Sequence, residues 1–182
     1  MSVFLNSNNT SLYGQQAYKK YINESCDISI NYPSEWKLEE KRDDDATRPV
    51  NYIVEFQPNN GDGGKSVVGI ELDDISHLPD RSIESMKMNE ETIITGQRTG
   101  TIETSQTINV AGHEAQKIVY TEPGINDEIL KKMQVDVLAF NREYKITFDT
   151  ADEELFQKYI STVEEMVKTF EISEPTYEEI SC

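Results

Sequence analysis

The chain has 182 residues, with 17 Lys and Arg against 34 Asp and Glu, so its formal net charge at pH 7 is −17. This length fits one domain with a substantial core. The acidic excess repels phosphate backbones and anionic lipid headgroups, which argues against nucleic acid and membrane surfaces as partners. No apolar run approaches the length of a spanning helix, and Met1–Asn6 has neither a basic start nor a long apolar stretch, so the sequence as given predicts no anchor and no signal peptide.

The first segments lead into the domain. Residues 1–11 are polar and predict a flexible leader, followed by a single domain over 12–173 and an acidic tail over 174–182. Apolar residues in Leu12–Ile22 are spaced loosely as in a helix. Ile28 and Ile30 then alternate with polar residues and predict a short strand that stops at Pro33. We expect Trp36, directly after this turn, to fill part of the core.

Two strands rich in aromatic and β-branched residues come next, over Tyr52–Phe56 and Ser66–Leu72. Gly, Pro and Asn between them predict a hairpin with a long tip. Gly63-Gly64-Lys65-Ser66 looks like the end of a phosphate-binding loop, but Asn59 stands where that loop needs glycine. A strand also follows where the loop needs a helix, so the segment predicts a hairpin tip.

A helix is predicted after Pro79, with Ile83, Met86, Glu90 and Ile93 at helical spacing and an end at Gly96. The segments Gly100–Val110 and Glu114–Tyr120 alternate like strands around a short turn and predict a second hairpin.

The last third of the domain has the clearest pattern. Apolar residues alternate over Val135–Ala139 and Tyr144–Phe148, with a turn expected at Asn141-Arg142. Offsets of three and four over Ala151–Phe170 predict an amphipathic helix, and Thr150 and Glu153 have capping-box spacing. Such a helix covers one face of a five- or six-stranded antiparallel sheet, which makes the fold class α+β.

The two cysteines, Cys26 and the last residue Cys182, are too few for a disulfide framework but form one candidate disulfide. A bridge between them closes nearly the whole chain into one loop. The alternative is a buried thiol at Cys26 and an exposed one at Cys182, because chain ends are usually mobile. Both alternatives stand.

Carboxylates supply better candidate metal ligands than a single histidine with distant carboxylates, which would suit zinc or copper. They cluster at Asp43, Asp44 and Asp45 and again at Asp73 and Asp74. Oxygen ligands of this kind suit Ca²⁺, so weak Ca²⁺ binding is the metal hypothesis. Neither cluster has the spacing of a calcium-binding loop, and a hydrated acidic surface is the alternative.

The sequence marks no catalytic constellation. Cys26 has no His or basic residue near it in the sequence, and no serine occupies a G-x-S-x-G elbow. His77 and His113 lie in separate segments without metal-type spacing. We therefore expect a protein that is not an enzyme, with no catalytic or cofactor-binding residues and no cofactor beyond weakly bound Ca²⁺.

Several segments resemble the PsbP-like family. The first is Ile28-Ser29-Ile30-Asn31-Tyr32-Pro33-Ser34-Glu35-Trp36, a strand followed by Tyr-Pro-Ser-x-Trp, and the last is the Tyr144–Phe148 strand with the long helix ending in Thr169-Phe170-Glu171-Ile172. The strands around Val54–Phe56 and Val67–Leu72 lie between them, and the resemblance covers about residues 20 to 172. It implies an α/β/α sandwich around a central antiparallel sheet, shared with the Ran-binding Mog proteins.

The resemblance also implies a class of function. The family's best-known members are extrinsic, non-enzymatic subunits on the lumenal face of photosystem II that help to retain calcium and chloride, and similar domains occur in exported bacterial and archaeal proteins. Basic docking segments of the photosystem subunits are not evident at a net charge of −17. The photosystem role is therefore not carried over, and no residue takes a role from the family.

The leading hypothesis is a non-catalytic PsbP-like binding or accessory domain outside the cytoplasmic membrane. It is expected to be a monomer that engages a protein partner, preferably a basic one, or a cation. The alternative is an intracellular regulator like the Mog proteins that binds a small GTPase, and a small hydrolase is the third. A signal peptide or lipid-attachment cysteine in the full-length gene would favour the first, and a native start at Met1 would count against it.

Overall fold

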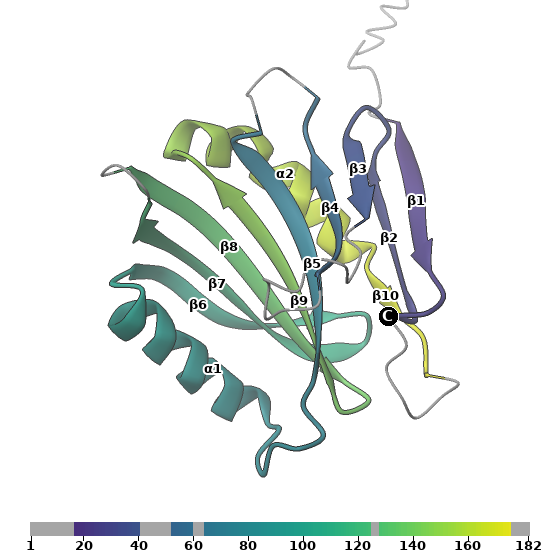
Figure 1. Cartoon of the computed structure of the whole chain (residues 1–182), viewed down its shortest axis with the longest axis vertical. Coiled ribbons are helices and arrows are strands. Elements are labelled where there is room, and N and C mark those ends of the chain that lie inside the picture. Colours follow the sequence, from purple (N-terminus) through teal and green to yellow (C-terminus); the bar gives the residue numbers. More distant parts are fainter. Residues whose placement is uncertain (1–16, 41–51, 60–63, 125–127, 176–182) are drawn as a thin grey trace, which may run out of the picture.

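The computed structural model describes residues 17–40, 52–59, 64–124 and 128–175 (Figure 1). The predicted leader, the cluster of Asp43, Asp44 and Asp45, and residues 176–182 of the predicted tail lie outside this range. Neither α-helix in the described ranges is long and apolar enough to cross a membrane.

The larger sheet has seven strands in the described part of the chain, and every neighbouring pair is antiparallel. Three more strands form a smaller sheet beside it. The order in the larger sheet is β3 (Lys37–Glu40), β4 (Tyr52–Gln57), β5 (Ser66–Asp74), β9 (Arg142–Thr150), β8 (Ile129–Ala139), β7 (His113–Pro123) and β6 (Thr101–Val110). This sheet has one or two strands more than the sequence predicts, and the expected antiparallel arrangement is confirmed.

The smaller sheet corrects one prediction. Strand β1 (Tyr18–Asn23) pairs along its full length with β2 (Ile28–Pro33), and β10 (Glu171–Ile172) joins the other edge of β2. The predicted helix over Leu12–Ile22 is therefore wrong from Tyr18 onward, because cross-strand pairing overrides the weak helical spacing. Residues 12–16 of that segment lie outside the described range.

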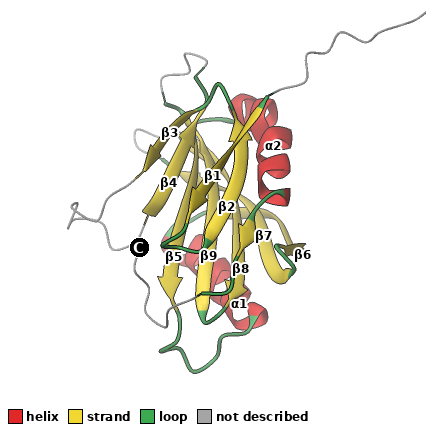
Figure 2. Cartoon of the chain, turned by 90° about the vertical axis from the view of Figure 1, so that its right-hand side faces the viewer, coloured by secondary structure: helices red, strands yellow, loops and turns green. Residues whose placement is uncertain are grey.

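Helix α2 (Glu153–Lys168) and the small sheet enclose the main core against the large sheet. The side chains that α2 buries are Phe156, Tyr159, Val163, Met166 and Val167. The Phe156 ring stacks on Phe148 of β9 with 5.5 Å between centroids, and Trp36 meets Tyr159 edge to face at 5.8 Å. Strand β2 runs beside α2 (Figure 2). The expected core position of Trp36 is confirmed, since it is 6% exposed.

The cap of α2 differs from the prediction by two residues. Asp152 is the N-cap, and its carboxylate accepts a hydrogen bond from the Leu155 backbone N–H at 2.9 Å. The predicted cap, Thr150, instead ends β9, where its hydroxyl donates to the Lys131 carbonyl at 2.9 Å. Because the Thr150 hydroxyl is used in this bond to β8, Thr150 does not cap the helix, which begins at Glu153.

Helix α1 (Ile83–Thr92) lies against the opposite face of the large sheet, beside β6 and β7 (Figure 1). A π-helical turn, η1 (Ile93–Gln97), follows it, with an i to i+5 bond from the Arg98 N–H to the Ile93 carbonyl. The wider turn rotates Ile94 into the fold in place of the predicted Ile93. Helices on both faces of the sheet confirm the α/β/α sandwich.

Tight two-residue turns connect β6 to β7 and β8 to β9. Ala111 and Gly112 have φ values of 53° and 82°, and Phe140 and Asn141 have 53° and 60°. Positive φ at both central residues matches the right-handed twist of the strands. The second turn is one residue earlier than predicted, because Arg142 already belongs to β9 and its guanidinium donates to the Asp27 carboxylate at 3.1 Å.

Candidate binding groove

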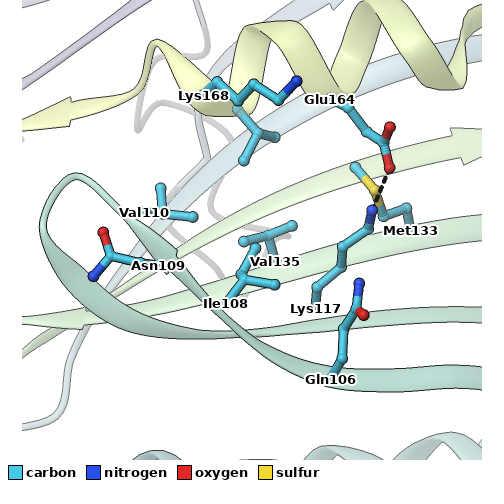
Figure 3. A pocket seen from close by; sticks show the side chains of 10 residues that line it. Gln106, Ile108, Asn109, Val110, Lys117, Met133, Val135, Glu164 and Lys168 are labelled. Carbon is cyan, nitrogen blue, oxygen red and sulfur yellow. Dashed lines mark hydrogen bonds and ion pairs between the residues drawn. The ribbon is translucent and has the colours of Figure 1, made fainter.

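A groove of about 290 Å³ opens between α2 and the strands β6, β7 and β8 (Figure 3). Its floor is apolar, with Met133 and Val135 of β8 buried beneath it. Ile108 and Val110 of β6 form one side, and Val167 of α2 forms part of the other. The groove exists because β6 and β7 extend the sheet past the part that α2 covers.

Charged side chains border the groove without entering its floor. The Lys117 ammonium of β7 is ion-paired with the Glu164 carboxylate of α2 at one end (Figure 3). Lys168 also lines the groove, and its ammonium lies 2.5 Å from the Glu165 carboxylate. Glu164 and Lys168 are four residues apart, which places them on one side of the helix.

Strand β6 forms one end of the large sheet in the described residues, so its outer edge has no strand partner there. The register with β7 shifts once, between Ile102 and Thr104, and is regular from Thr104 to Val110. This regular stretch contains no Lys and no Pro, the residues that commonly protect edge strands. Its side chains alternate between the groove and the opposite face as far as Ile108, and beside the turn to β7 both Asn109 and Val110 line the groove.

The groove has the chemistry of a binding surface. Apolar side chains, the amides of Gln106 and Asn109 and two ammonium groups dominate its lining. The one carboxylate in that lining belongs to Glu164 and is held by Lys117. The groove can therefore accommodate apolar side chains of a partner and hydrogen-bond to its polar ones, and the adjacent strand edge can hydrogen-bond to an extended backbone.

A second feature lies on the other face of the sheet, beneath α1. We name it the α1 cluster, and it consists of Glu90, Gln134, Asp136, Glu143 and Lys145. The Lys145 ammonium lies 3.2 Å from the Glu90 carboxylate and 3.6 Å from that of Glu143. The Gln134 amide donates to Glu90 at 3.0 Å and to both Asp136 oxygens at 3.0 and 2.9 Å.

Burial changes the acidities in the α1 cluster. Asp136 is fully buried, and loss of hydration raises the pKa of its carboxyl well above the ordinary value. Burial likewise raises the pKa of Glu143, although Lys145 opposes this effect. For Lys145 burial would lower the pKa, but the neighbouring carboxylates of Asp136, Glu143 and Glu90 raise it.

The structure describes two of the five predicted metal ligands, Asp73 and Asp74. Asp74 accepts a hydrogen bond from the Ser76 backbone N–H at 2.8 Å, which lowers the pKa of its carboxyl. Asp73 pairs in register with Glu143 at the end of β5. The described residues contain no group of three or more His, Cys, Asp or Glu side chains arranged to hold a metal ion. Asp43, Asp44 and Asp45 are outside those residues.

The remaining residues considered in the sequence are the two cysteines and the two histidines. Cys26 is fully buried, and Cys182 lies outside the described residues, so their pairing stays a prediction. The His113 ring contacts Phe140 edge to face at 5.6 Å, whereas His77 lies in the loop between β5 and α1. The two histidines therefore belong to different parts of the fold.

Sequence analysis missed both features, although each has a signal. Ile108 and Val110 alternate with polar residues, but alternation does not tell which helix approaches that face. Gln134, Asp136 and Lys145 occupy the polar positions of alternating strands, which normally face water. The cover provided by α1 turns these positions into buried ones.

The comparisons with known proteins place this fold. The family described as PsbP-like protein matches residues 5–172, whereas no curated protein matches the sequence. The structure of cyanobacterial PsbP (CyanoP) from Synechocystis sp. PCC 6803 aligns with a TM-score of 0.64 and 13% identity, over 88% of this chain and 95% of that one.

Two further solved structures share the fold at low identity. LpqN of Mycobacterium tuberculosis, described as involved in cell envelope biogenesis, has a TM-score of 0.60 and 10% identity, over 89% of this chain and 88% of that one. The Ran-binding protein Mog1p of Saccharomyces cerevisiae has a TM-score of 0.58 and 10% identity, over 87% and 96%. At these identities the likeness concerns the fold alone, while the family match covers most of the sequence: the chain belongs to the PsbP-like protein family.

Proposed function

We propose that this chain is a non-catalytic binding domain that engages a protein partner through the groove and the adjoining edge of β6. The observation that carries the proposal is their continuity: an apolar groove of about 290 Å³ opens directly beside a sheet edge without a strand partner in the described residues. An extended segment added to β6 would place alternate side chains in the groove.

The partner segment is expected to be extended, and the partner protein is expected to be basic overall. Edge strands bind extended chains because their free N–H and C=O groups complete a hydrogen-bond ladder. A net charge of −17 attracts cationic partners and raises their association rate. Ile108 and Val110 favour an apolar side chain at every second position of that segment.

Location and cation binding belong to the same proposal. The match to the PsbP-like family, whose best-known members are extrinsic lumenal subunits, supports an accessory role outside the cytoplasmic membrane. Binding of Ca²⁺ by Asp43, Asp44, Asp45, Asp73 or Asp74 is tested separately by calorimetric titration with Ca²⁺. Weak extracellular sites bind Ca²⁺ at roughly millimolar concentration. Absence of binding heat in that range would exclude Ca²⁺ binding and leave the proposal of a protein partner unchanged.

The experiment first identifies the partner by crosslinking and then measures its affinity for the chain. A photoreactive amino acid replaces Asn109, which is exposed at the groove, in cells that encode the chain, and Met88 on α1, 63% exposed, serves as the control position. The protein crosslinked from position 109 is purified, and its affinity is measured by calorimetry for the wild type, Ile108→Asp and Thr107→Asp.

Ile108→Asp puts a charge in the groove, whereas Thr107→Asp puts the same charge on the opposite face of β6. We expect the first to weaken binding at least about tenfold and the second by less than about threefold. Equal effects of both variants, or crosslinking only from position 88, would contradict the proposal. A second copy of this chain or a small GTPase as the crosslinked protein would identify the alternative partners, the latter suggested by the fold shared with Mog1p.

A further inference from the structure

The two helices are attached to the sheet in different ways. Helix α2 buries five apolar or aromatic side chains, whereas Glu90 is the single buried residue of α1. The nearest apolar anchor is Ile94 in η1, which packs with Ile118 and Tyr120. Polar contacts therefore hold α1 in place, and segments with few buried apolar contacts open more readily than the core.

Those polar contacts converge on the α1 cluster. Glu90 binds Lys145 of β9 through one carboxylate oxygen and Gln134 of β8 through the other, at 3.2 and 3.0 Å. A further contact runs from the Ser105 hydroxyl of β6 to the Glu91 carboxylate at 2.5 Å. The position of α1 thus depends on the charge state around Glu90.

The α1 cluster holds three carboxyl groups and one ammonium group. Asp136 has no exposed surface, and burial keeps its carboxyl protonated to higher pH. The neighbouring cation Lys132 is already paired with Glu122 at 2.8 Å and Asp149 at 3.4 Å. The groups that face the cluster from the remaining strands are Tyr52 of β4, Glu71 and Asp73 of β5 and Gln116 of β7. They add no positive charge, whereas on the helix side the Arg98 guanidinium, which follows η1, interacts with Glu90 and lies 4.0 Å from the Glu122 carboxylate.

We propose that α1 is a pH-responsive lid, closed on the sheet while Asp136 is protonated and loosened when Asp136 is ionised beside the carboxyl groups of Glu90 and Glu143. Ionised carboxylates repel one another in the dry space beneath the helix, and within the α1 cluster only the Lys145 ammonium opposes them. Lifting α1 admits water, which weakens the repulsion between the carboxylates. The opened face presents Asp136 to solvent on β8, the strand that also forms the floor of the groove, and Glu143 on the neighbouring strand β9.

Linkage gives the size of the effect. Opening lets Asp136 lose a proton that the closed state retains, so the opening equilibrium rises about tenfold per pH unit until Asp136 ionises in the closed state as well. Above that pH the equilibrium levels off. The same relation makes the opening equilibrium level off at its lowest value below about pH 4, where Asp136 is largely protonated in both states.

The test is amide hydrogen exchange of the full chain between about pH 5 and about pH 8, with α2 amides as the internal reference for intrinsic rates and global stability. We expect the opening of α1 relative to α2 to rise at least about tenfold across this range. Asp136→Asn, which keeps the shape and removes the charge, should flatten the dependence. Glu84→Gln, an exposed carboxylate on the same helix, should leave it unchanged.

A wild-type ratio constant within about twofold would overturn the proposal, whatever the variants do. An unchanged pH dependence in Asp136→Asn would overturn it as well. If that variant loses the protection of α2, Glu143→Gln takes its place and is expected to reduce the steepness. None of these readouts involves a partner, so they are independent of the groove.

Discussion

The Lys145 ammonium lies 3.2 Å from the Glu90 carboxylate and joins the central strand β9 to helix α1. Removal of one member of a buried ion pair leaves the other charge uncompensated, which costs about 3–5 kcal/mol. Lys145→Met should therefore lower the free energy of unfolding by about this amount, measured by urea denaturation.

The exposed pair Lys37–Glu39, at 3.2 Å, provides the matched control. Exposed pairs contribute about 0–1 kcal/mol, so Lys37→Met should change stability by no more than that. A loss below about 1 kcal/mol in Lys145→Met would show that the α1 cluster contributes little to the fold.

The stability of the protein should be highest in mildly acidic solution. Burial raises the pKa values of Glu71, Asp136, Glu143 and Asp149 in the folded state. A carboxyl with a raised pKa binds its proton more tightly in the folded chain, so stability falls as pH rises from the unfolded to the folded value.

Carboxylates at the surface act in the opposite direction. Hydrogen bonds to the folded chain lower the pKa values of Asp74, Asp80, Glu153 and Glu171, and the stability they contribute is lost as pH falls below their unfolded values. We expect a maximum near about pH 5 in urea denaturation between about pH 3 and about pH 8, with Asp136→Asn flattening the alkaline side. A steady increase in stability up to about pH 8 would contradict these assignments.

The stacked rings of Phe156 and Phe148 should be central to the attachment of α2. Phe156 is 4% exposed, and its truncation to alanine leaves a cavity, which costs about 3–5 kcal/mol. Ile129→Ala removes a side chain that is 65% exposed and should change stability by less than about 0.5 kcal/mol. Equal unfolding midpoints for the two variants would place the core elsewhere.

The Cys26–Cys182 disulfide can be tested by alkylation of the unfolded, non-reduced protein followed by mass measurement. We expect no alkylated thiol, and an increase in stability of about 5 kcal/mol over the reduced chain if the long loop acts through chain entropy. Two alkylated thiols would exclude the bridge.

Local pattern was sufficient for much of the fold. The alternation over Val135–Ala139 and Tyr144–Phe148, with the apolar spacing of α2, predicted the last hairpin and helix because each residue type agrees with its exposure. Tyr18–Ile22 has loose helical spacing but forms a strand, because pairing with β2 decides its conformation. The Thr150 cap failed for a similar reason: its hydroxyl bonds to Lys131, a residue 19 positions away.

The candidate site was far less predictable. The groove depends on how far α2 covers the sheet, and no periodicity in the sequence reports that overlap. Asp136 occupies a polar position in an alternating strand, a position that normally faces water, whereas the structure buries it under α1. Such sites arise where elements distant in sequence meet.

Protection of β6 in the complex is the most direct test of partner binding at the groove. Amide hydrogen exchange should be measured with and without the protein crosslinked from position 109. Strand addition predicts that alternate backbone amides between Thr104 and Val110 become protected while those of β3, at the other end of the sheet, do not change. Binding that leaves β6 unprotected, or protects β3 instead, would contradict a docking surface at this edge.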